Sequence, residues 1–296
     1  MPLIDAITAK CADPGFRQRV VDLLIDMCTV DTAPNPDVTV MRDREAAVFA
    51  RINAYLGPGP WRLETRPVDP AIADHPAFSK LHFTKTPARP AGLSPEQAYA
   101  GRGNLLVMLD GQPDAAAGTA TAINAHIDII APFIAPVRDG DTITGRGTID
   151  DKGHVAAICG ALKLIAELIA DGDLELKNRI TAMFPIEEET GGNGSLALAL
   201  DRELRERYDS ILVMECASRN VFPANRGAVW FRCEAALAAD AGPEVSRSVA
   251  DDQVLSPVSV DVGKARSRAT LDAKAAGRCR ARSLASPCGG GRRKAG

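Results

Sequence analysis

Four short segments of the chain carry acidic or imidazole side chains directly after a run of apolar residues. They are His126 with Asp128 in NAHIDII, Asp150 with Asp151 in GRGTIDDKGH, Glu187–Glu189 in PIEEETGG, and Glu215 at the end of SILVME. Open α/β sheets place their active sites at the carboxyl ends of strands. Carboxylates and an imidazole at successive strand ends therefore predict a shared cation, which would also relieve the repulsion between Asp150 and Asp151.

Each segment has an ordinary explanation when it is taken alone. A lone histidine such as His126 is more often a hydrogen-bonded core residue than a metal ligand. Asp150 or Asp151 could favour the positive end of a following helix, and the three glutamates could form a solvated turn. Glu215 is harder to explain in this way, because a carboxylate that ends an apolar strand must be solvated, paired or coordinated.

Hydrophobic periodicity predicts the elements that must position these residues. Helices are predicted over FRQRVVDLLIDMC, over KGHVAAICGALKLIAELIADG and over DREAAVFARINAYLG, with Asp43 as a candidate N-cap and Gly57 as the stop. Strands are predicted at WRLETRPV, NLLVML, TATAINAH, RITAMFPI and SILVMEC. We expect NLLVML and TATAINAH to be neighbouring strands. A hairpin is predicted at VRDGDTITGRG. Residues 66–102 are predicted to form a long irregular connection. The alternation predicts an α/β fold with a mixed, mostly parallel central sheet flanked by helices.

Composition and cysteine usage are typical of a soluble, cytoplasmic globular protein. Hydrophobic residues make up 46% of the 296 positions, and no apolar run reaches the roughly 18–20 residues of a membrane span. The N-terminus lacks the basic and apolar regions of a signal peptide, so we expect no membrane partner. Seven cysteines without a C-x-x-C pair indicate reduced thiols rather than a disulfide framework.

The charge and the complexity of the sequence change toward the C-terminus. Residues 261–296 carry ten Lys or Arg and two Asp, a net charge of +8, whereas the whole chain is at -3. The basic segment lacks interleaved aromatic residues, so nucleic acid is an improbable partner. We expect a catalytic domain over residues 1–222, the start of an incomplete lid over 223–240, and a low-complexity, disordered basic tail over 241–296.

In their order and spacing, HID, GRGTIDDKG, EEETGG and ME resemble the signature of the co-catalytic zinc hydrolases. That family includes acetylornithine deacetylase, succinyl-diaminopimelate desuccinylase, carboxypeptidase G, aminoacylase and carnosinase-like dipeptidases. The similarity covers roughly residues 16 to 234, and its most specific part is GRG-x-x-D-x-KG followed by E-E-[ST]-G. It implies a zinc-exopeptidase-like fold and two zinc ions in the active site, with cobalt or manganese as alternatives.

The resemblance also implies roles for single residues. The implied metal ligands are His126, Asp150 as the bridge between the two ions, Glu189 and Glu215. Asp128 would orient His126, Glu188 would be the general base, and Asp151 would not be a ligand. Two cations about 3.5–4 Å apart share and activate a water in such sites. The implied activity is hydrolysis of amide bonds in small substrates, such as N-acyl amino acids or dipeptides.

The sequence departs from the family in its C-terminal part. The family takes a further metal-ligand histidine from near the C-terminus, whereas no histidine follows His154 here. NRGAVWFRCE resembles the strand that enters the lid, which is also where the family often dimerises, but the rest of the lid pattern is missing. We therefore expect a truncated or frame-shifted chain with a weakened second metal site and low or absent activity. The alternative is a catalytically impaired homologue that acts as a metal-binding scaffold.

Overall fold

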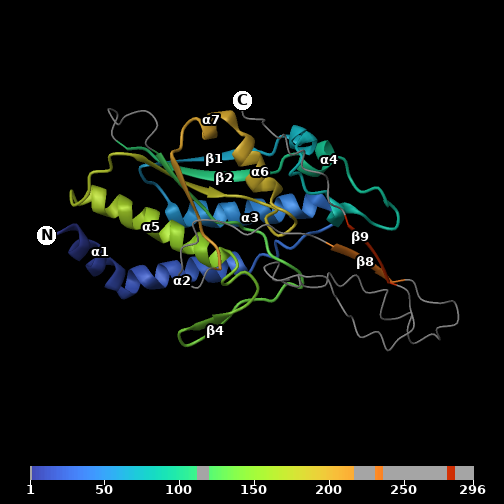
Figure 1. Cartoon of the computed structure of the whole chain (residues 1–296). Helices are drawn as coiled ribbons and strands as arrows, with labels where there is room; N and C mark the ends of the chain where they lie inside the picture. Colours follow the sequence, from blue (N-terminus) through green and yellow to red (C-terminus); the bar gives the residue numbers. More distant parts are fainter. Residues whose placement is uncertain (1, 112–119, 217–230, 236–278, 284–296) are drawn as a thin grey trace, which may run out of the picture. The chain divides into compact units, whose positions relative to one another are not determined.

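The computed structural model describes residues 2–111, 120–216, 231–235 and 279–283 (Figure 1). The chain divides into two compact units, Met1–Val221 and Phe222–Gly296, and all four acidic segments lie in the first. In the second unit, β8 (Phe231–Ala235) pairs antiparallel with β9 (Cys279–Ser283). The other residues of the expected lid start, 223–240, and of the expected basic tail, 241–296, lie outside the described residues.

A five-stranded mixed sheet with the strand order β1-β2-β6-β3-β7 forms the centre of the first unit. Its strands are β1 (Trp61–Pro67), β2 (Gly103–Leu109), β3 (Ala120–Asn124), β6 (Arg179–Phe184) and β7 (Ser210–Val213). β2 pairs antiparallel with β1 and β6, and β3 pairs parallel with β6 and β7. The expected mixed α/β sheet is confirmed, although its parallel pairs equal its antiparallel pairs in number.

The order of the strands corrects one expectation and explains where the site forms. NLLVML and TATAINAH become β2 and β3, but they are not neighbours, because β6 lies between them and pairs with both. The parallel strands β6, β3 and β7 point the same way, so their carboxyl ends meet at one edge of the sheet. The acidic segments at 126–128, 187–189 and 215 follow these three ends.

Long helices cover one face of the sheet (Figure 1). They are α2 (Pro14–Cys28), α3 (Val38–Leu56) and α5 (Lys152–Ala170), and the short α1 (Leu3–Ala12) precedes them. Their apolar stripes pack on Leu105, Val107 and Phe184 of the sheet. The predicted helices are confirmed, but the expected N-cap Asp43 is wrong. α3 begins earlier, where the side chain of Asp37 accepts a hydrogen bond from the Thr39 amide.

A smaller cluster packs on the opposite face of the sheet. There α6 (Asn193–Leu200) and α7 (Arg202–Arg205) bring Leu198 and Leu204 against Leu106, Met108 and Met183. β2 is therefore buried on both faces, which explains its continuous apolar sequence. Figure 1 shows these two helices across the sheet from α3 and α5.

The remaining elements are short and lie in the connections between the strands and helices of the first unit. The connection over 66–102 contains η1 (Pro70–Asp74), η2 (His82–Thr84) and α4 (Pro95–Tyr99), which begins at a capping box of Ser94 and Gln97. The predicted hairpin is formed by β4 (Val137–Asp139) and β5 (Thr142–Thr144).

By length and composition alone, α5 is apolar enough to cross a membrane, with a mean hydropathy of 1.6. The expectation from the sequence concerned uninterrupted apolar runs, and Lys163 and Glu167 interrupt the run in α5, so that criterion did not single out this helix. Half of its apolar window is nevertheless buried inside the fold, where the helix contacts α1, α2 and α3. This burial is typical of a core helix.

Candidate metal centre

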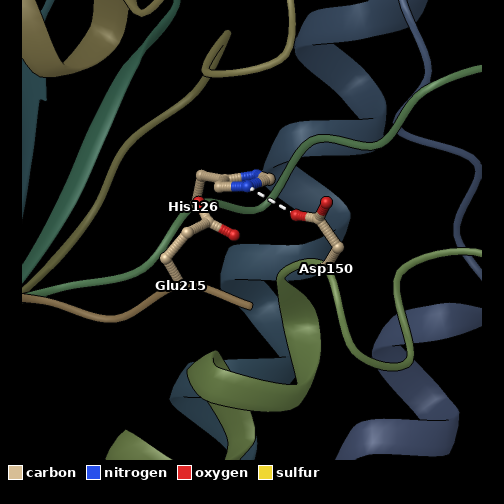
Figure 2. Close-up of side chains that lie close together, drawn as sticks. All are labelled: His126, Asp150 and Glu215. Carbon is tan, nitrogen blue, oxygen red and sulfur yellow. Dashed lines mark hydrogen bonds and ion pairs between the residues drawn. The ribbon is translucent and has the colours of Figure 1, made fainter. Parts of the chain in front are cut away.

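Three of the four expected metal ligands come together at the carboxyl edge of the sheet. One potential ligand atom from each of His126, Asp150 and Glu215 lies within 4.8 Å of the others, and Figure 2 shows their side chains converging. His126 lies just beyond β3, Asp150 lies in the loop before α5, and Glu215 lies just beyond β7. Their convergence thus depends on two neighbouring parallel strands and the start of one helix.

His126 is the buried member of this group, with 2% of its surface exposed. Its Nε2 lies 3.0 Å from Oδ1 of Asp150, and its Nδ1 lies 3.3 Å from Oδ1 of Asp128. Residues i and i+2 of an extended segment face the same side, and these two side chains do. A carboxylate at Nδ1 fixes the orientation of the ring and leaves Nε2 directed toward Asp150 and Glu188.

Asp128 is also buried, and it joins two of the acidic segments. Its Oδ1 accepts a hydrogen bond from the amide of Glu188, and its Oδ2 accepts one from the amide of Glu189, both at 3.0 Å. The carboxylate therefore fixes the backbone after β6 as well as the imidazole after β3. This second contact was not expected from the sequence, because the two segments are 60 residues apart.

Asp151 has a supporting position and is not part of the group of three. It is fully buried, and its Oδ2 accepts a hydrogen bond of 3.0 Å from the backbone amide of His126. Its Oδ1 contacts Nδ1 of His154 on the first turn of α5. The two adjacent aspartates thus differ in direction: Asp150 faces the imidazole ring of His126, whereas Asp151 holds the backbone of the same residue.

The expected general base, Glu188, and the fourth expected metal ligand, Glu189, lie beside the group of three. Oε2 of Glu188 is 3.8 Å from Nε2 of His126, which places it next to the proposed metal position. Among the described residues, the group of three that could hold an ion does not include Glu189. Its backbone is fixed by Asp128, but no second cluster of ligand atoms forms around it in the part of the chain that the structure describes.

Sequence reasoning gave no role to Glu187 and did not single out Arg102. Glu187 is buried, and its carboxylate accepts hydrogen bonds from Arg102 at 2.5 Å and from the hydroxyl of Tyr99 at 3.0 Å. Arg102 also binds Glu45 through two nitrogens, at 2.6 and 3.0 Å. The burial of Glu187 follows from its place at the end of an apolar strand, but its partner lies 85 residues earlier and leaves no local signal.

The electrostatics of the site reflect an excess of carboxylates around one imidazole. Burial and the neighbouring charges of Asp150 and Asp128 raise the pKa of Glu189 to about 7. Burial also raises the pKa of Glu188. Burial alone would lower the pKa of His126, but its hydrogen bonds to Asp128 and Asp150 outweigh this effect and raise the pKa to about 11. A divalent cation in this position would compensate the carboxylates and replace the proton on the imidazole.

The donor set therefore fits a divalent metal ion. One imidazole and two carboxylates, with a further carboxylate nearby, are the ligands that zinc and related ions take in catalytic sites, where one position stays open for water. His126 also has the second partner at Nδ1 that metal-bound histidines require.

Comparison with known proteins identifies the family. The model of Peptidase family M20/M25/M40 matches residues 122–275, which is more than half of the chain. The chain therefore belongs to this family of metallopeptidases, and the resemblance read from the four motifs is confirmed. The matched region begins in β3 and includes every expected site residue.

Two curated relatives and one solved structure illustrate the similarity. A probable carboxypeptidase of Arthroderma benhamiae is 29% identical over 140 residues, covering 44% of this chain and 29% of the relative. Acetylornithine deacetylase of Arabidopsis thaliana is 28% identical over 136 residues, covering 43% of this chain and 29% of the relative. Human carnosine dipeptidase 1 has the same fold, with a TM-score of 0.50 at 16% identity over 72% of this chain and 41% of that structure.

The chain thus matches less than a third of the length of these curated relatives. The truncation or change of reading frame expected from the sequence stays a prediction.

Proposed function

We propose that this chain is a metal-dependent hydrolase that cleaves amide bonds of small substrates, such as N-acyl amino acids or dipeptides. The observation that carries the proposal is the convergence of His126, Asp150 and Glu215 from three separate segments of the chain. The names of the relatives, a probable carboxypeptidase and an acetylornithine deacetylase, agree with this class of reaction. Its proposed setting is the cytoplasm, with a small molecule as its partner.

The three residues would hold one divalent ion, most simply zinc. When bound, such an ion lowers the pKa of a coordinated water and polarises the carbonyl of the substrate. Asp150 is the proposed bridge to a second ion, because its side chain contacts His126 and is also 49% exposed. Glu189 would complete that second position only if further ligands join it.

Glu188 is the proposed general base. Its carboxylate lies 3.8 Å from Nε2 of His126, so it is close enough to take a proton from a water beside the ligand group. Burial raises its pKa, which makes it a better proton acceptor than an exposed glutamate. It could then deliver that proton to the nitrogen of the leaving amine, since its amide is held in place by Asp128.

The test is hydrolysis of a panel of N-acyl amino acids and dipeptides by the full chain, loaded in turn with zinc, cobalt and manganese. We expect turnover that is lost in Glu188→Gln while metal binding is retained, since the amide cannot accept the proton. Removal of a general base lowers rates by about 100- to 10,000-fold. Equal turnover by wild type and variant would contradict the proposed role, and no turnover with any metal would contradict the proposed function.

A second candidate is a metal-binding scaffold with little or no catalysis. It is favoured by the position of Glu189 outside the group of three ligands found among the described residues. The same substrate panel separates the two candidates, because a scaffold would bind zinc without turnover. Homodimerisation, common in the resembling family, is a further proposal that a sedimentation measurement would test.

A further inference from the structure

We propose that Arg102 and Glu187 form an internal anchor that positions the pair Glu188 and Glu189 for the metal site. The inference rests on the proposed function for its catalytic consequence, but the geometry of the anchor does not depend on that function. Arg102, Glu45 and Glu187 lie outside the group of three ligands and are almost completely buried, with side chains 0%, 6% and 1% exposed.

In this anchor, Glu45 fixes the side chain of Arg102, and Arg102 in turn fixes the side chain of Glu187. Glu45 on α3 accepts two hydrogen bonds from the guanidinium of Arg102, which leaves Nη1 directed at Glu187 and at the carbonyl of Ala98. A planar guanidinium can hold two carboxylates in fixed directions in a way that a lysine ammonium cannot. The side chain of Glu187 therefore has one defined position relative to α3.

The other carboxylate oxygen of Glu187 is held from a different direction. It accepts a hydrogen bond from the hydroxyl of Tyr99, and that hydroxyl accepts one of 2.9 Å from Asn193 at the start of α6. Asn193 is itself fixed by two hydrogen bonds to the backbone of Ser79. Both oxygens of Glu187 are thus satisfied inside the protein, as a buried carboxylate requires.

The backbone around Glu187 shows why the loop needs this anchor. Glu187 has a φ angle of 59°, in the left-handed region that side-chain-bearing residues seldom adopt. Such a conformation persists where surrounding contacts determine it. The amides on either side are also fixed, since that of Ile186 donates to Asn104 and that of Glu188 donates to Asp128.

Together these contacts define the path of residues 186–189 from strand to helix. The amides fix the direction of the backbone, and the side chain of Glu187 prevents the segment from rotating toward solvent. Glu188 then lies with its carboxylate 3.8 Å from Nε2 of His126, and Glu189 lies close enough to Asp150 for that charge to raise its pKa. Arg102 and Glu187 are positioning residues in this account, because they do not themselves touch the metal group.

The decisive comparison is Glu187→Gln with Glu187→Ala. Both variants keep a Cβ and hence the same backbone cost at φ 59°, but only glutamine keeps an oxygen for Arg102. Peptides covering residues 186–192 should exchange their amide hydrogens at least about tenfold faster in Glu187→Ala, while Glu187→Gln stays within about threefold of wild type. A peptide covering β2 should be unchanged in both variants. Exchange of 186–192 within about twofold of wild type in Glu187→Ala would overturn the inference.

Arg102→Lys provides the second variant in case Glu187→Ala does not fold, which near-UV circular dichroism would show. Its matched control is Arg66→Lys, because Arg66 also pairs with several carboxylates, none of which belongs to the site. We expect faster exchange over 186–192 in Arg102→Lys only. Equal exchange in the two lysine variants would overturn the inference.

The catalytic consequence is measured on the metal-loaded chain. A small displacement of catalytic groups can lower turnover by about 100-fold, so Glu187→Ala should lose kcat by roughly that factor with KM changed less than about threefold, and Glu187→Gln should restore most of it. A KM increase with unchanged kcat would contradict a positioning role. If the wild type shows no turnover, the proposed function fails, but the exchange comparison still decides whether the anchor exists.

Discussion

The ends of β3 and β7 contribute ligands to the same site from very different surroundings. His126, beyond β3, lies in the interior, where Asp128, Asp150 and Asp151 contact its ring or its backbone. Glu215 follows β7, which is an edge strand of the described sheet and has all four of its residues exposed. One side of the site is therefore fixed by packing, whereas the other is supplied by a strand end with little support.

The contrast extends to the contacts of the two carboxylates. Asp128 accepts hydrogen bonds from two backbone amides and contacts the imidazole. The carboxylate of Glu215 instead accepts a hydrogen bond of 2.8 Å from the amide of its own neighbour, Cys216. The buried half of the site, around His126 and Asp128, is preformed, and the exposed half, at Glu215, is adjustable. We expect the buried half to contribute most of the metal affinity and of the folding stability, and the exposed half to contribute little to either.

The largest expected difference is in metal affinity. His126→Ala should weaken zinc binding on the order of 1,000-fold, which corresponds to about 4 kcal/mol. Glu215→Ala should weaken it by only about 10- to 100-fold, because water can replace an exposed carboxylate ligand more easily than a buried imidazole. Competition with a chromophoric chelator measures the zinc affinity of both variants. An equal loss of affinity in the two would contradict the difference between the buried and the exposed half of the site.

The same contrast predicts that truncating a side chain destabilises the protein more on the buried strand β2 than on the exposed strand β7. Leu106 on β2 is fully buried and Leu212 on β7 is 48% exposed. Leu106→Ala should lower the free energy of unfolding by about 2–5 kcal/mol. Leu212→Ala should change it by about 0.5 kcal/mol or less. Urea titration of the two variants tests this pair, and a large loss in Leu212→Ala would show that β7 is covered in solution.

A smaller effect is expected within the site itself. Asp128→Asn leaves one of the amides of Glu188 and Glu189 without an acceptor, because the amide group of asparagine has one acceptor oxygen. This should cost about 1–3 kcal/mol in the metal-free chain. The matched change on the exposed half, Glu215→Gln, should cost about 0.5 kcal/mol or less. Urea unfolding in a chelator distinguishes the two, and equal costs would contradict the preformed role of Asp128.

The last prediction concerns pH. The pKa of His126 is raised to about 11 in the metal-free protein, so its imidazole carries a proton at pH 8, and an ion that binds Nε2 must displace that proton. Apparent zinc affinity should therefore rise about tenfold per pH unit between pH 7.5 and 8.5. This window lies above the pKa of about 7 for Glu189, so that carboxylate contributes little to the slope. Titrations in buffers of different ionisation enthalpy should show the release of about one proton per ion, and affinity independent of pH would contradict this protonation state.

The fold was largely predictable from the sequence because periodicity is a local property. The helices α2 and α5 and the strands β1 and β6 lie where their apolar patterns place them. The N-cap of α3 was misjudged because Val38 and Thr39, β-branched residues that are poor helix formers, occupy its first turn. The neighbours of β2 were misjudged because strand order depends on tertiary pairing, which adjacency in the sequence does not determine.

The candidate site was predictable to the extent that its residues sit in local motifs. His126, Asp150 and Glu215 were expected as ligands, and the structure brings them together. The supporting contacts were not predictable, because Arg102 and Glu187 are far apart in the chain and a buried ion pair has no local sequence pattern. The clustering of Glu189 with a second set of ligands is not seen among the described residues and stays a prediction.

The most direct test of the central claim is the metal content of the purified chain after reconstitution with zinc, measured by elemental analysis beside His126→Ala. We expect at least one tightly bound zinc ion per chain in the wild type and its loss in the variant. A wild-type chain that retains no zinc, or a variant that retains as much as the wild type, would contradict the assignment of His126, Asp150 and Glu215 as a metal centre.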